Sequence, residues 1–112
     1  MKYVLVISDD GTVPLGHEEI ERLPAHVAWM DYMDRAGVTL LGGARLRPGG
    51  DSTTVRTRDG QVLISDGPFV ETKEQIGGFA MIECDDLDMA VEVASRHPFA
   101  AHGAVEVRPV WE

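Results

Sequence analysis

The chain is arranged around one stretch, Asp66-Gly67-Pro68-Phe69-Val70-Glu71-Thr72-Lys73-Glu74-Gln75-Ile76-Gly77-Gly78-Phe79. Gly67-Pro68 predicts a defined turn, because Pro fixes φ and Gly adopts backbone angles that other residues avoid. Gly77-Gly78 predicts either a β-bulge or the close approach of another backbone. Charged side chains crowd between these two dipeptides, so the stretch is more constrained than an ordinary linker.

Strands are expected on both sides of this stretch. Residues 53–58 and 61–65 flank Asp59-Gly60, which is a strong signal for a β-hairpin. Thr and Arg alternate on the first arm, which predicts that one face of the hairpin is exposed to water. Residues 79–83 show little alternation, so we expect a central strand that is buried on both faces.

The first half of the chain begins with a strand at residues 2–8 and turns helical from about Gly16. An apolar face is predicted by helical spacing, formed by Ile20, Leu23, Val27 and Met30. Pro24 interrupts this run, and we expect a kink or two helical pieces, with Pro24 opening the second. Gly37 ends the helix.

The remaining elements complete an α+β fold. Strands are expected at residues 38–46 and 104–110, and a second helix starts after Asp85 or Asp86 and stops at His97-Pro98. The order β-α-β, hairpin, β-α-β predicts one domain, residues 1–112, with a ferredoxin-like split β-α-β plan and an inserted hairpin. Two helices cover only one sheet face, so we expect a homodimer through the other.

Composition narrows the possible partners and location. The net charge is −9, with 10 Lys and Arg against 19 Asp and Glu. Nucleic acid and anionic membrane surfaces are therefore not expected to bind. Apolar runs all fall short of the ~20 residues of a membrane span. The single Cys84 excludes an intrachain disulfide and favours a reducing compartment, so we expect a cytoplasmic protein.

The chain resembles the YCII-related superfamily and, within it, the DGPF (DGPFAETKE) proteins. The match rests on the stretch quoted above, on Pro24-Ala25-His26 and on His102-Gly103-Ala104-Val105-Glu106-Val107-Arg108-Pro109-Val110. The resemblance implies a ferredoxin-like fold that dimerises sheet to sheet into an α+β barrel. It also implies a catalytic helix histidine at His26 with an acidic partner before a late Pro. His97 occupies that acidic position here, so a His–Asp pair is not carried over intact.

His26 and Asp66 are the catalytic candidates. The ordinary pKa of a histidine lies near neutrality, which suits a general acid or base. We hypothesise that Asp66 supplies the missing carboxylate and orients His26, as a carboxylate does in hydrolytic triads. The alternatives are a boundary histidine bonded to a backbone carbonyl and an Asp that only accepts hydrogen bonds in its turn.

Substrate-binding residues are expected in the same loop and opposite the helix. They are Pro68, Phe69, Glu71, Lys73 and His97, with Lys73 meeting an anionic substrate. The alternative is a solvated loop with local ion pairs, which contribute little. The spacing of His17, His26, His97 and His102 is poor for a metal, and the glycine pairs fit no nucleotide loop, so we expect neither metal nor cofactor. Trp29 and Tyr32 are expected to pack rather than to stack on a ligand.

Two main functions follow. The first is a small cofactor-free enzyme that uses His-based acid–base chemistry on a small carbonyl or carboxylate metabolite, by isomerisation, lactone chemistry or elimination. The alternative is a non-catalytic dimer that binds a metabolite or regulates; a purely structural accessory protein is a third possibility. The sequence does not identify the substrate.

Overall fold

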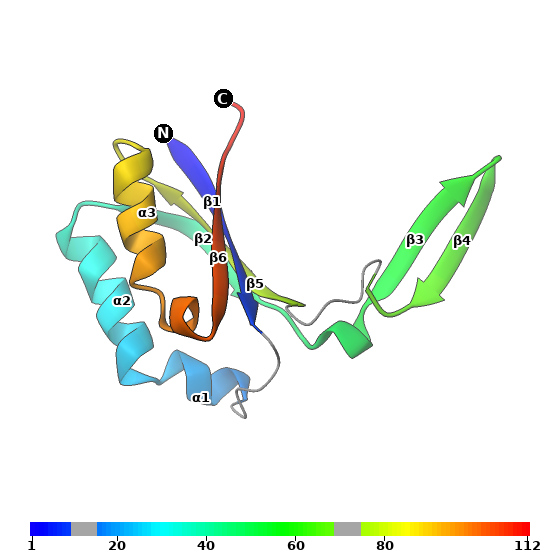
Figure 1. Cartoon of the computed structure of the whole chain (residues 1–112), viewed down its shortest axis with the longest axis horizontal. Coiled ribbons are helices and arrows are strands. Elements are labelled where there is room, and N and C mark those ends of the chain that lie inside the picture. Colours follow the sequence, from blue (N-terminus) through cyan, green and yellow to red (C-terminus); the bar gives the residue numbers. More distant parts are fainter. Residues whose placement is uncertain (10–15, 69–74) are drawn as a thin grey trace.

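The computed structural model describes residues 1–9, 16–68 and 75–112. Its main sheet is antiparallel with the order β2-β5-β1-β6, formed by β1 (Lys2–Asp9), β2 (Thr39–Arg45), β5 (Gln75–Glu83) and β6 (Gly103–Pro109). Three helices lie on one face of this sheet (Figure 1): α1 (His17–Glu21), α2 (Pro24–Arg35) and α3 (Leu87–Ser95). This is an α+β arrangement consistent with a ferredoxin-like fold.

The first helical region breaks at Pro24, as predicted. Pro24 is the first residue of α2, where its missing N–H costs no intrahelical hydrogen bond. The predicted apolar face was wrong for α2, because Val27 is 49% exposed while Trp29 and Met33 are buried. The predicted apolar face assumes one continuous helix, whereas the chain changes direction at Pro24. The helical spacing of apolar residues before the break therefore does not predict which side of α2 is buried.

The core lies between the helices and one face of the sheet. Tyr3 and Leu5 on β1 and Ile82 on β5 are fully buried there, together with Val93 on α3. Asp86 caps α3, since its carboxylate accepts a hydrogen bond from the Met89 N–H at 2.9 Å.

The opposite face of the sheet is open in the single chain. Phe79 on β5 is 42% exposed, and its neighbours Val4, Val6 and Met81 are half-buried. The prediction that β5 is buried on both faces is therefore wrong for one chain, because the described helices all lie on the other side. β5 is nevertheless central, pairing with both β1 and β2.

The glycines of β5 and β2 permit close strand packing. The β1–β5 register shifts between Ile7 and Ser8, which leaves Gly77 as the extra residue of a bulge. A Cβ on Gly43 would collide with the Phe79 carbonyl of β5. β5 starts at Gln75, earlier than predicted, because Gly78 pairs with both β1 and β2, and Gln75 and Ile76 continue the pairing with β1 beyond the bulge.

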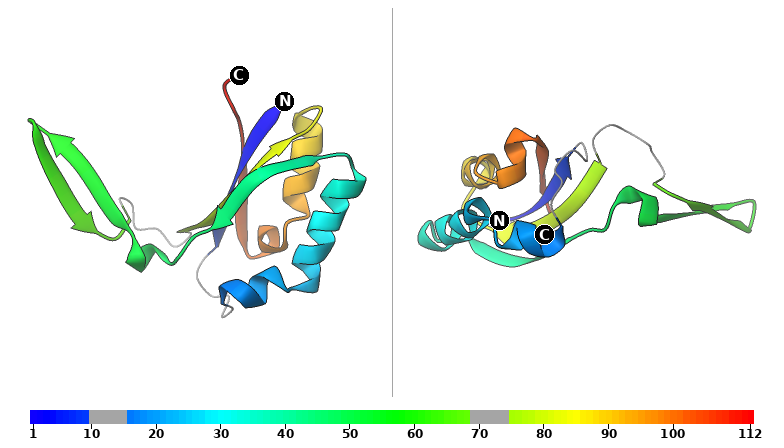
Figure 2. Two further views of the ribbon diagram at one scale, coloured as in Figure 1. Left: turned by 180° about the vertical axis from the view of Figure 1, so that it is seen from behind. Right: turned by 90° about the horizontal axis from the view of Figure 1, so that it is seen from below.

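The predicted hairpin forms a separate two-stranded sheet, β3 (Thr53–Arg58) and β4 (Gln61–Asp66). Its turn has positive φ at Asp59 (51°) and Gly60 (75°), as expected for a two-residue hairpin loop. The hairpin projects away from the main sheet (Figures 1 and 2). Both faces are largely exposed, not one as predicted, because no other described element packs against it.

Two short 3₁₀ helices complete the fold, η1 (Gly49–Asp51) before the hairpin and η2 (Pro98–Ala101) before β6. Within the described residues, no helix combines the length and apolar character needed to cross a membrane.

Candidate functional site

A pocket of about 400 Å³ lies between the helices and the β2–β5 half of the sheet. Its walls are mostly apolar, with Ile20, Met30, Leu40 and Ala80 among them. The polar side chains that line it, among the described residues, are His26, His97, Arg45 and Asp9. An apolar cavity with a few polar groups is the usual form of a small-molecule site.

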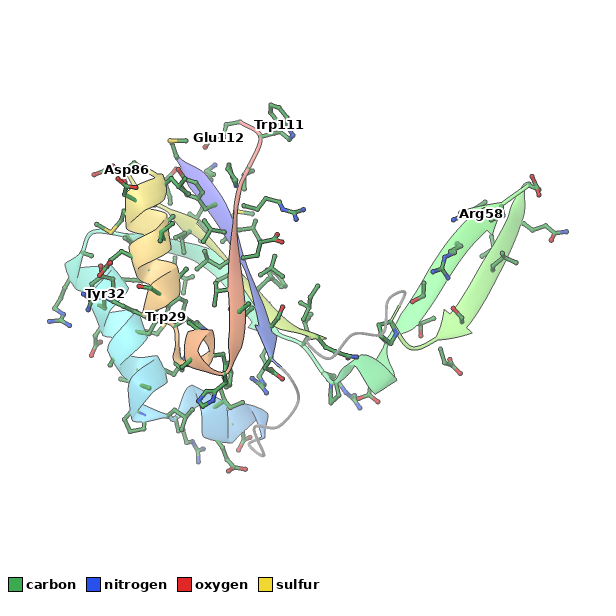
Figure 3. All side chains as sticks on the ribbon, in the orientation of Figure 1. Trp29, Tyr32, Arg58, Asp86, Trp111 and Glu112 are labelled. Atoms are coloured by element: carbon green, nitrogen blue, oxygen red, sulfur yellow. The ribbon has the colours of Figure 1, made fainter. Side chains whose placement is uncertain are left out.

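Trp29 is the centre of an aromatic cluster on the pocket wall. Its indole N–H donates a hydrogen bond to the Val93 carbonyl at 2.9 Å, which holds the ring between α2 and α3 (Figure 3). The His97 ring meets it edge-on at a centroid distance of 4.7 Å, and the His26 ring lies 6.0 Å away. The two histidines therefore lie near the same indole, one from α2 and one from the start of η2.

His97 is buried and acts as the N-cap of η2. Its Nδ1 accepts a hydrogen bond from the Phe99 N–H at 3.1 Å. Burial and, to a smaller extent, the neighbouring His26 lower the pKa of His97 to about 4. The neutral ring therefore carries its proton on Nε2, because Nδ1 is the acceptor. At neutral pH, His97 is a hydrogen-bond donor rather than a base.

Arg45 enters the pocket from the end of β2. Its guanidinium carbon lies 5.6 Å from the centre of the Phe99 ring, and Phe99 also lines the pocket. Asp9, at the end of β1, lines the same pocket and lies against Gly77. The described chain thus places one permanent cation and one carboxylate at the strand ends that border the cavity.

The sequence-predicted site residues fall into three groups. His26 and His97 come together in the pocket. Asp66 is the last residue of β4, opposite Thr53, and neither it nor Pro68 belongs to the described pocket lining. Phe69, Glu71 and Lys73 lie outside the described residues.

Arg45 and Phe99 were not among the predicted site residues. Arg45 pairs with Gly78, which belongs to the Gly77-Gly78 dipeptide of the opening stretch. Glycines have no side chain and leave space beside the neighbouring strand. A long side chain on the strand next to Gly77-Gly78 was therefore recognisable in the sequence as a candidate pocket residue. Phe99 depends on η2, for which the sequence showed no periodic pattern.

Metal ligation finds no support in the described part of the chain. No group of three or more His, Cys, Asp or Glu side chains there is placed to hold a metal ion.

The chain belongs to a known family. The YCII-related domain matches residues 1–112, and the chain is a member of that family. It is 44% identical over 69 residues to an uncharacterised protein of Rhizobium meliloti (strain 1021). That match covers 60% of this chain and 56% of the relative, so it spans little more than half of the relative's length.

A solved structure with the same fold is 5-chloro-2-hydroxyhydroquinone dehydrochlorinase from Burkholderia phenoliruptrix AC1100, in complex with 2,5-dihydroxybenzoquinone. The TM-score is 0.54 with 16% sequence identity, covering 100% of this chain and 94% of that one. At this identity the likeness establishes the α+β fold.

Proposed function

We propose that this protein is a small enzyme that moves a proton on a small carbonyl- or carboxylate-bearing molecule, with His26 as the general acid or base. The observation that carries the proposal is that His26 and His97 line one apolar pocket, about Trp29, in different roles. Two polar side chains in one apolar pocket can divide the functions of base and donor between them.

The hydrogen bond made by His97 supports a division of roles between the two histidines. His97 offers its Nε2–H to a substrate oxygen, because its Nδ1 is already occupied by the Phe99 N–H. His26, which is half-buried, removes a proton from the adjacent carbon or hydroxyl. The proton then resides on His26, and the negative charge that develops on the oxygen is stabilised by the His97 N–H.

The structural neighbour supports this reaction class. It is named as a dehydrochlorinase and was solved with a dihydroxybenzoquinone, a ring that carries carbonyl oxygens. Elimination begins or ends with a proton transfer next to such an oxygen, so it belongs to the chemistry that one histidine base and one donor support. By analogy, we include elimination with isomerisation and lactone chemistry.

Asp66 remains a proposed partner of His26. Within one chain it lies on the projecting hairpin, so such a pairing would require the hairpin of a second copy. Pro68 remains a proposed substrate contact on the same condition. Phe69, Glu71 and Lys73 lie outside the described residues and also remain proposed substrate contacts.

We further propose that two copies pair through the open sheet face. Val4, Val6, Phe79 and Met81 form a continuous apolar surface there, which a second sheet would bury. The hairpin also exposes Val55, Val62, Leu63 and Ile64. An isolated two-stranded hairpin is marginally stable in water, so contact with another copy would stabilise it.

The test is a turnover screen with two histidine variants. Small keto acids, lactones and hydroxyquinones are offered to the wild-type protein, and His26→Gln is then assayed on any substrate found. A general base contributes about 100-fold or more, so the variant should lose at least that in kcat. His102→Gln, an exposed histidine outside the described pocket lining, is the matched control and should keep its turnover.

An equal loss in both variants would contradict a catalytic role for His26. Tight binding of a screened compound, with no turnover by the wild type, would favour the non-catalytic binding protein instead.

A further inference from the structure

Arg45 differs from the arginines that form ion pairs in the described chain. A carboxylate lies within 4.0 Å of each of Arg22, Arg47, Arg96 and Arg108. Arg45 has no ion pair among the described residues, although it is half-buried and lines the pocket. Its only recorded partner there is the face of Phe99, a contact that holds the guanidinium without occupying its N–H donors.

Those donors suit a ligand carboxylate. The guanidinium fork matches the two oxygens of a carboxylate, and such bonds are strong in an apolar surrounding. Asp9 is the carboxylate that also lines the cavity, but β5 separates its strand from that of Arg45.

The distance along the aromatic cluster limits the shape of the ligand. Phe99 lies close to both Arg45 and His97: its ring centre is 5.6 Å from the guanidinium carbon and 5.8 Å from the centre of the His97 ring. A cation and a neutral N–H donor therefore both lie next to Phe99, with at most about 11 Å between the guanidinium carbon and the centre of the His97 ring. A flat molecule of that length, with an oxygen at each end, would meet both.

We infer that Arg45 selects small carboxylates, and that the substrate carries a second oxygen function at its other end, which the Nε2–H of His97 meets. This inference rests on the proposed function, because it names the substrate class of the same pocket. It makes Arg45 a specificity-determining residue rather than a catalytic one.

The experiment uses a matched pair of probes, 4-hydroxybenzoate and its neutral amide 4-hydroxybenzamide, followed by NMR. The chain has two tryptophans, and each gives one indole N–H signal. Trp29 lines the pocket, whereas Trp111 is 100% exposed near the C-terminus (Figure 3) and serves as the internal reference. Titration of the Trp29 signal yields Kd without any assay of turnover.

Arg45→Gln should weaken 4-hydroxybenzoate binding about 10-fold or more, the loss expected for a charge-assisted hydrogen bond. Arg47→Gln is the matched control, because it removes one positive charge two residues later, outside the described pocket lining. It should change Kd less than about twofold, since exposed charges are screened. The amide should bind both Arg45→Gln and wild type weakly and equally.

Three results would overturn the inference: equal weakening by the two Arg variants, equal binding of acid and amide to the wild type, or no shift of Trp29 by either probe at millimolar concentration. Arg45→Lys guards against misfolding, because it retains the charge and should recover part of the affinity. Failure of the proposed function would give a different result from failure of this inference. If only the proposed function failed, His26→Gln would keep its turnover while Arg45→Gln still weakened binding of the acid.

Discussion

At the scale of single residues, several contacts hold the His97 side chain in one orientation. It caps η2 through Nδ1, packs its ring against Trp29 and Phe99, and lines the pocket. Protonation would place a charge in this apolar setting and turn Nδ1 from acceptor into donor, which breaks the cap. The same contacts that orient its Nε2–H therefore oppose its protonation.

This environment predicts a pH-dependent stability. The pKa of His97 is about 4 in the folded chain against an ordinary 6.5, so the unfolded chain binds the extra proton between these values. The free energy of unfolding should therefore fall as pH decreases from 6.5 to 4, by at most about 3 kcal/mol from this group. Urea denaturation across that range measures the loss.

His97→Asn is the control for this prediction. Asn can still accept the Phe99 N–H as a helix cap but does not titrate. Its unfolding free energy should change less steeply over the same pH range. Parallel pH curves for the variant and the wild type would show that His97 does not bind its proton as described.

At the scale of elements, the contact between β2 and β5 shapes the pocket floor. Gly43 faces Ala80, and a Cβ there would lie 3.0 Å from the Ala80 Cα as well as against the Phe79 carbonyl. Backbone atoms cannot move aside as a flexible side chain can, so the strand pair would have to separate.

Gly43→Ala should therefore destabilise the chain by about 1–3 kcal/mol, the usual cost of overpacking. Gly42→Ala is an adjacent control on the same strand, because a Cβ at Gly42 would meet nothing within 4 Å. Thermal unfolding should show a lower Tm for Gly43→Ala and little change for Gly42→Ala. Similar Tm values for the two variants would argue against a close approach of these strands.

At the scale of the whole molecule, apolar side chains are exposed in two places among the described residues: on the open sheet face and on the hairpin. The hairpin projects away from the main sheet (Figure 2). The proposed homodimer would cover the first. Sedimentation at micromolar concentration should then show a species of twice 12.2 kDa. A single species at the monomer mass would refute the dimer.

Met81→Glu tests which face is used, because Met81 pairs with Val4 and Gly42 in the middle of the open face. A buried carboxylate there should shift the protein to the monomer. Val91→Glu is the matched control on α3, where the side chain is already 51% exposed on the helix side. It should remain a dimer if the sheet face is the interface.

Local sequence signals determined most of the elements of this protein. The hairpin at Asp59-Gly60, the start of α2 at Pro24 and the cap of α3 at Asp86 depend on turn and capping chemistry within a few residues. The element order and the long motif then led to the α+β fold and to the YCII-related family. The resemblance to this family indicates His26 and His97 as site residues from the sequence alone.

Contacts between distant parts of the chain decided the buried face of α2, the length of β5 and the make-up of the pocket. Whether Trp29 or Val27 faces the core depends on the angle at which α2 leaves Pro24, and the long extent of β5 depends on strands far away in the sequence. Arg45 and Phe99 meet although they are distant along the chain, because η2 folds against the ends of the sheet strands. Asp66 lies on the hairpin rather than in the pocket lining for the same reason: position in space follows from packing, not from spacing in the sequence.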